Sequence, residues 1–274
     1  MSERSVPNAL AVDHLVPRAR AGDGAAVEEV LAAIAPAVYR YGRRMCGSAH
    51  EADDVLQDTL LNVALHLDDF EGRAAFSSWV FALCRSACAR RRRGLKNRPP
   101  LAVDEAPEAC DPGPSPEALA AEREVLGAVL AALDRLSPEA REVLLLRDVE
   151  GLTAPEAAAA LEISIDALKS RLHRARTALR RELEPGEDRP ASTPGCPDVM
   201  ALWSKKLDGD LTPIDCASME AHLAVCPRCS VACDTLRNAL SACQSLSTTR
   251  VPAHVQERVK AAARAWVERR SPAR

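Results

Sequence analysis

Apolar residues recur at helical spacing along most of the chain. Leu31, Ile34 and Val38 lie three and four residues apart, and a second apolar series runs from Val55 to Leu67. Positions with this spacing share one face of a helix, so each series predicts an amphipathic helix with its apolar face in a core. Aromatic residues make up only 3% of the sequence, which argues against a β sandwich or barrel. The pattern therefore predicts an all-α protein.

Two segments rich in proline and glycine interrupt this pattern, at residues 94–116 and 185–195. Both residue types stop helices and favour extended or turn backbone. A chain of 274 residues also has room for more than one core. We therefore expect two linkers that separate three helical domains, at residues 8–93, 117–184 and 196–270.

The middle domain carries three signals for the start of a helix. Ser137 is a predicted N-cap followed by Pro138, Thr153 and Glu156 have the spacing of a capping box, and Ser164 can cap a third helix. Two short helices with a tight connection, of which the later is basic, predict a helix-turn-helix.

The last helix of this domain has a basic face. Residues 163–183 contain six lysines and arginines against two acids, although the formal net charge of the whole chain is −3. Such a face can follow a DNA backbone, because each neutralised phosphate releases counterions. A solvated surface helix is the alternative. The candidate DNA contacts on this helix are Lys169, Ser170, Arg171, His173, Arg174 and Arg176.

A second basic cluster, a run of four arginines, closes the first domain. The run consists of Arg90, Arg91, Arg92 and Arg93. Cations at the end of a helix are also favoured by the helix dipole, so a solvated helix end is the alternative to a DNA contact.

These segments together resemble the extracytoplasmic-function (ECF) sigma factors of bacterial RNA polymerase. Residues 133–183 look like the region-4 helix-turn-helix, residues 50–67 look like the region-2 helix that contacts the polymerase clamp, and residues 76–93 resemble the part that melts and reads the minus-10 element. The resemblance implies that core RNA polymerase and promoter DNA, at the minus-35 and minus-10 elements, are the partners.

The resemblance also assigns roles to residues of the first domain. It places polymerase contacts at Asp54, Gln57 and Asp58, and minus-10 contacts at Phe70 and the four arginines. Opening a promoter requires a pocket that captures an unstacked base, and Phe70 is the candidate for that pocket. We expect Trp79 and Phe81 in the core. The family commonly has Asn at the position of Ser86 and Asp at that of Arg90, which puts the minus-10 preference in question.

Six cysteines gather between residues 196 and 243. His222, Cys226 and Cys229 form a His-x3-Cys-x2-Cys pattern, in which residues four apart share a helix face and Cys-x2-Cys is a standard chelate spacing. Cys196 would complete a tetrahedron. The pattern resembles the zinc-binding anti-sigma domain, which predicts a small helical metal-binding domain acting on the sigma domains of its own chain.

The remaining thiols, Cys216, Cys233 and Cys243, exceed what a four-ligand zinc site needs, and they are candidates for further metal ligands or for metal sensing. The arrangement looks like the Cys-rich domain of the CorE-type sigma factors, whose activity depends on metals. Soft thiolates favour zinc or copper, with cadmium a further candidate. The closing apolar stripe from Val255 to Trp266 predicts a helix that packs on the tail or on the sigma domains.

Several classes of protein are not expected. The chain has no HExxH, GxSxG or P-loop motif, so we do not expect an enzyme. It has no apolar run of the ~18–20 residues that span a bilayer and no signal peptide, so we expect a cytoplasmic protein without membrane contact. Two alternatives stay open: a redox-sensing sigma factor with a structural zinc tail, and a one-component helix-turn-helix regulator.

Overall fold

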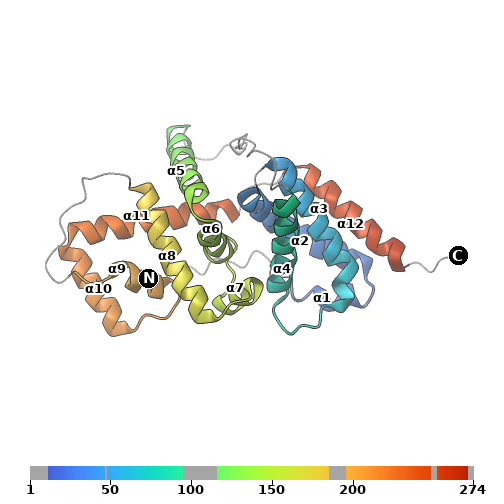
Figure 1. The fold of residues 1–274 in the computed structure, drawn as a ribbon, viewed down its shortest axis with the longest axis horizontal. Coiled ribbons are helices and arrows are strands. Elements are labelled where there is room, and N and C mark those ends of the chain that lie inside the picture. Colours follow the sequence, from blue (N-terminus) through green and yellow to red (C-terminus); the bar gives the residue numbers. More distant parts are fainter. Residues whose placement is uncertain (1–11, 47, 95–115, 185–195, 248–251, 271–274) are drawn as a thin grey trace. The chain divides into compact units, whose positions relative to one another are not determined.

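The computed structural model describes residues 12–46, 48–94, 116–184, 196–247 and 252–270, and these residues form helices and turns without any strand (Figure 1). The prediction of an all-α protein is confirmed. The elements are α1 (Val16–Arg20), α2 (Gly24–Met45), α3 (Ala49–His66), η1 (Leu67–Asp69), α4 (Phe76–Gly94), α5 (Pro116–Arg135), α6 (Pro138–Leu144), η2 (Leu145–Val149), α7 (Ala154–Leu161), α8 (Ile165–Leu183), α9 (Val199–Leu207), α10 (Pro213–Val225), α11 (Pro227–Ser247) and α12 (His254–Arg270).

The chain forms two compact units, each of which combines distant segments. Unit 1 comprises residues 1–107, 145–164 and 247–274, and unit 2 comprises residues 108–144 and 165–246. The two expected linkers lie outside the described residues, apart from Gly94 and Pro116 at their edges. The division into three domains therefore stays a prediction.

Helices α2, α3 and α4 form the centre of unit 1. The Asp23 side chain caps α2 by accepting a hydrogen bond from the Ala26 N–H at 3.1 Å, and Ser48 caps α3 in the same way. A Cβ added at Gly42 would lie 3.3 Å from backbone atoms of Ala52, so the glycine allows α2 and α3 to approach closely. The apolar series that predicted these helices is fully buried between them.

Residues 145–164 are anchored to α2 and α4 within unit 1. Arg40 of α2 makes a bidentate ion pair with Glu150, at 2.6 and 3.0 Å; the Glu150 side chain is buried and that of Arg40 is 12% exposed. The capping box of α7 forms as predicted, and its Glu156 carboxylate also accepts a hydrogen bond from Ser77 of α4 at 2.9 Å. Burial raises the pKa of the Glu150 carboxyl, and the Arg40 guanidinium opposes this.

Helix α12 lies along α3 and α2 (Figure 1). Its predicted stripe is buried there, with Val255, Val259, Ala262 and Trp266 each at most 5% exposed. Polar contacts flank the stripe: His254 contacts Asp53 of α3 at 2.7 Å, and Arg270 pairs with Asp68 at 2.7 Å. We expected this helix to pack either on the Cys-rich tail or on the sigma-like domains, and it packs on the sigma-like helices α2 and α3.

Unit 2 joins the predicted basic helix to the Cys-rich segment. Helix α8 buries the stripe Leu168, Leu172, Ala175 and Leu179, and packs against α5, α6 and α9. Helices α9 to α11 enclose a separate apolar core that contains Trp203 and Leu236.

Candidate metal centre and nucleic-acid interface

Four side chains of the Cys-rich segment converge on one point. His222 lies in the last turn of α10, Cys226 ends that helix, Cys229 lies in the first turn of α11, and Cys196 precedes α9. All four ligand atoms lie within 4.8 Å of one another. The Cys196 Sγ atom is 3.2 Å from His222 Nε2, 3.8 Å from Cys226 Sγ and 3.1 Å from Cys229 Sγ.

This group fits a tetrahedral metal ion of the zinc type. Zinc–sulfur bonds of about 2.3 Å place ligand atoms about 3.8 Å apart, close to the separations in the cluster. Burial, together with the neighbouring Cys196 and Cys226, raises the pKa of the Cys229 thiol to about 12. A bound cation reverses this effect because it favours the thiolate. The donor set of three sulfurs and one imidazole is one that zinc and related soft ions use.

The cluster is also part of the core of this segment. Cys226 is fully buried and Cys229 is 9% exposed, and both pack with Val199, Trp203 and Met219. Ligands that are also core residues couple metal binding to folding, because the apo form loses part of the same packing.

The other three tail cysteines lie outside the group of four. Cys216 is half-buried on α10, and its thiol donates to Glu220 at 3.5 Å. Cys233 lies in the apolar core, where burial raises the pKa of its thiol to about 11. Cys243 is buried further along α11. Their predicted part in metal sensing stays a prediction.

The segment that follows α9 engages two of the predicted DNA contacts on α8. Asp210 pairs with Lys169 at 2.5 Å, and this hydrogen bond raises the pKa of the lysine. Arg176 is only 2% exposed, donates to the Ser204 hydroxyl at 2.7 Å and pairs with Asp208 at 3.4 Å. Both aspartates are placed by the turn at the end of α9.

Gly209, between the two aspartates, makes this turn possible. Its φ of +75° is a left-handed conformation that side chains other than glycine rarely adopt. The other DNA candidates on α8 differ in exposure: Ser170 and Arg174 are exposed, whereas Arg171 and His173 are half-buried.

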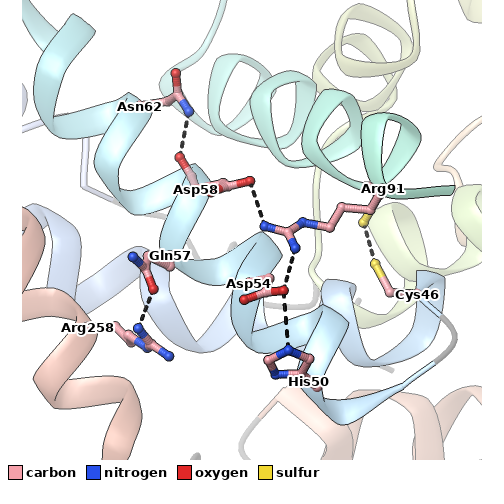
Figure 2. Close-up of polar contacts among 9 residues, drawn as sticks. Cys46, His50, Asp54, Gln57, Asp58, Asn62, Arg91 and Arg258 are labelled. Carbon is pink, nitrogen blue, oxygen red and sulfur yellow. Dashed lines mark hydrogen bonds and ion pairs between the residues drawn. The ribbon is translucent and has the colours of Figure 1, made fainter. Parts of the chain in front are cut away.

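The predicted polymerase contacts of α3 are engaged within unit 1, as Figure 2 shows. Arg91 of α4 donates to the carboxylates of Asp54 and Asp58, at 3.3 Å for the latter. The Gln57 side chain accepts a hydrogen bond from Arg258 of α12. A predicted DNA contact, Arg91, thus neutralises two predicted polymerase contacts.

Phe70 borders a hollow of about 250 Å³ next to α4, together with Ser78, Trp79 and the residues from Asp69 to Ala74. Its ring lies 5.4 Å from that of Trp79. Phe81 is buried in the core as expected, but Trp79 is half-buried and lines the hollow. The hollow is therefore a candidate for the base pocket, with two aromatic residues rather than one.

The remaining arginines of the basic run are less informative. Arg90 is exposed, which agrees with a DNA contact or a solvated helix end. The side chains of Arg92 and Arg93 lie outside the described residues.

Comparison with known proteins finds matches over all three predicted domains. Sigma-70 region 2 matches residues 30–98, sigma-70 region 4 matches residues 126–179, and a putative zinc-finger matches residues 196–230. The ECF RNA polymerase sigma factor SigG of Mycobacterium tuberculosis is 32% identical over 184 residues, which cover 59% of this chain and 50% of SigG. The chain thus spans half the length of this relative.

A relative that is matched over nearly its whole length decides the family. The RNA polymerase sigma factor NccH of Alcaligenes xylosoxydans xylosoxydans is 32% identical over 194 residues, which cover 67% of this chain and 98% of NccH. The chain belongs to the ECF sigma factors. A solved structure of CnrH in complex with the cytosolic domain of CnrY matches with a TM-score of 0.46 and 27% identity, over 61% of this chain and 92% of that chain.

Membership of this family confirms the predicted resemblance to ECF sigma factors. It also confirms the expectation that the chain is not an enzyme, because sigma factors are initiation factors. In the part of the chain that the structure describes, every helix is too short or too polar to cross a membrane. Sequence reasoning did not identify Asp208 and Asp210 as partners of α8. The sequence feature that could have indicated them is a pair of acids on either side of Gly209, which can pair with the cations of the basic helix.

Proposed function

We propose that this ECF sigma factor binds core RNA polymerase, directs initiation at specific promoters, and is gated by metal binding to its own Cys-rich tail. The observation that carries the proposal is that one continuous segment contains both the metal cluster and the residues that contact α8. This segment begins with the ligand Cys196, continues through Asp208 and Asp210, which hold two residues of α8, and ends at the ligands His222 and Cys226.

The contacts on α8 support an inhibitory role for this segment. A DNA phosphate and the Asp210 carboxylate would both bind the Lys169 ammonium, so the two compete for one cation. Arg176 is buried beneath α9 and reaches a phosphate only after the α9 segment moves away. Promoter binding by α8 therefore requires release of the tail.

The metal cluster connects this release to a signal. Bound at Cys196, His222, Cys226 and Cys229, a zinc- or copper-type ion supplies strong bonds that hold the two ends of the segment together. The chain residues between those ends include both aspartates. The difference in metal affinity between the docked and released states sets the size of the switch.

Contacts within unit 1 also support the view that the structure represents the inhibited state of the protein. Residues 145–164 of the region-4 match are anchored on region 2, although a factor that reads both promoter elements must separate the two regions. The elements lie about 25 base pairs apart, which is about 85 Å of DNA. Helix α12 and Arg91 also engage the predicted polymerase contacts. Because core polymerase and promoter DNA are its partners, the proposal places the protein in the cytoplasm.

The test is run-off transcription with core polymerase on the promoter upstream of the protein's own gene. Apo protein is compared with protein given Zn(II), Cd(II), Cu(II) or Cu(I) under controlled redox conditions. We expect transcription to change with only some metals, and Cys226→Ala and Cys229→Ala to remove the response. Cys84→Ala is the matched control, because Cys84 lies on α4, outside the Cys-rich segment, and its variant should respond like wild type.

The outcomes separate the alternatives. Equal transcription in every lane contradicts metal gating and leaves a sigma factor with a structural metal site. A response to peroxide without a response to metal favours a redox-sensing tail. Failure to retain core polymerase, with Asp54→Arg behaving like wild type, favours a one-component regulator.

A further inference from the structure

Two thiols outside the Cys-rich segment lie in direct contact within unit 1. Cys46 ends α2 and Cys88 lies on α4, and their Sγ atoms are 2.8 Å apart. The contact joins positions 42 residues apart in the sequence. Figure 2 shows it beside Arg91. Cys84, one turn earlier on α4, is buried and is not in a disulfide.

The geometry allows the two sulfurs to bond with little movement. A disulfide has sulfur atoms about 2.05 Å apart, so the pair needs to close by less than about 1 Å. Cys46 is half-buried and accessible to a small oxidant, whereas Cys88 is 2% exposed and is reached only by its partner. An accessible thiol beside a second, resolving thiol is the arrangement of reversible redox sites.

We propose that Cys46 and Cys88 are a site of reversible oxidative modification, at which a peroxide converts the thiol pair to a disulfide. The Cys46 thiolate attacks one oxygen of hydrogen peroxide, the O–O bond breaks, and the sulfur becomes a sulfenic acid. The other oxygen leaves as hydroxide, which takes up the proton that the thiol released and becomes water. The Cys88 thiol then displaces water from the sulfenic acid and forms the S–S bond. Two thiols and one peroxide thus give one disulfide and two waters, and a dithiol reductant reverses the change.

The disulfide would tie the end of α2 to the turn of α4 that carries Arg91. That arginine, three residues beyond Cys88, holds Asp54 and Asp58 of α3. The bridge closes a loop of residues 46–88 and restricts the unfolded chain, so it stabilises unit 1. It acts without the metal cluster, which lies in unit 2.

The experiment treats the full-length, zinc-loaded protein with a small excess of hydrogen peroxide. Free thiols are then alkylated, and proteolytic peptides are analysed by mass spectrometry without reduction. We expect a linked peptide pair containing Cys46 and Cys88, its loss in Cys46→Ser and in Cys88→Ser, and its retention in Cys84→Ala. Calorimetry should show an upward shift of the unfolding midpoint of wild type that dithiothreitol reverses and that Cys46→Ser lacks.

Two results would overturn the proposal. One is full alkylation of Cys46 and Cys88 after peroxide treatment, which means that the pair does not react. The other is a sulfinic or sulfonic Cys46 without the linked peptide, which means that Cys88 does not resolve the sulfenic acid. Neither result depends on metal gating or on transcription, so the proposed function is tested separately.

Discussion

Replacing Trp266 by alanine should release α12 from region 2 and activate the protein. The indole is 5% exposed, packs against Gly24 at the start of α2, and lies under the Arg270 guanidinium at 5.0 Å. Truncating a buried tryptophan costs about 3–5 kcal/mol. The ion pair between Arg270 and Asp68 is exposed and contributes only about 0.2–1 kcal/mol. The indole therefore dominates the docking of α12.

The expected size of the effect follows from these values. If about 3 kcal/mol is lost from docking alone, the ratio of docked to released α12 falls by about 150-fold, since about 1.4 kcal/mol corresponds to a factor of ten. Release frees Gln57 from Arg258 and Asp53 from His254. Both side chains belong to the helix that is predicted to contact polymerase.

Two measurements on the same variant test this reasoning. Hydrogen–deuterium exchange should become faster in α12 and on the face of α3 beneath it, and run-off transcription without added metal should increase. Val267→Ala is the control, because Val267 is the adjacent residue, is 50% exposed and should leave both measurements unchanged. Faster exchange without increased transcription would show that α12 covers region 2 without inhibiting it. Unchanged exchange would show that Trp266 does not hold the helix.

Further predictions concern α8 and the anchor of residues 145–164. Arg171→Ala should weaken promoter binding and lower its salt dependence by about one unit of slope, measured by fluorescence anisotropy over a salt series. Asp210→Asn should strengthen promoter binding by the full-length protein, because Lys169 is released; unchanged affinity would exclude competition at this lysine. Arg40→Ala should lower the free energy of unfolding in urea by about 3–5 kcal/mol, because it leaves the buried Glu150 carboxylate uncompensated. Replacing both, Arg40→Met with Glu150→Leu, should cost much less, and an equal cost would mean that the pair itself stabilises unit 1.

Most helices of this protein could be predicted from the sequence because their signals are local. The start of α7 is determined by a capping box between Thr153 and Glu156, which are only three residues apart, and the structure contains this box as predicted. The ligands His222, Cys226 and Cys229 are likewise close in sequence, so their spacing alone places them near one another. Cys196 is remote in sequence, and it was added because a tetrahedral site needs a fourth ligand.

The contacts between distant segments could not be predicted in this way. The sequence placed Arg176 among the DNA contacts, and its periodicity did not indicate that α9 buries it. The sequence likewise did not indicate that Cys88 of α4 meets Cys46 at the end of α2. In both cases the partner is remote along the chain. A helical pattern shows which face of a helix is buried, but it does not show which distant segment covers that face.

The sequence by itself determined the helices and the family, and it indicated the four residues that converge at the candidate metal centre, because caps, periodicity and short motifs act over a few residues. Only the tertiary structure decided that α12 covers α3, that residues 145–164 belong to unit 1, and that Asp208 and Asp210 engage α8. These pairings depend on the shape and charge of whole faces that are brought together by folding. They are also the contacts on which the proposed regulation rests.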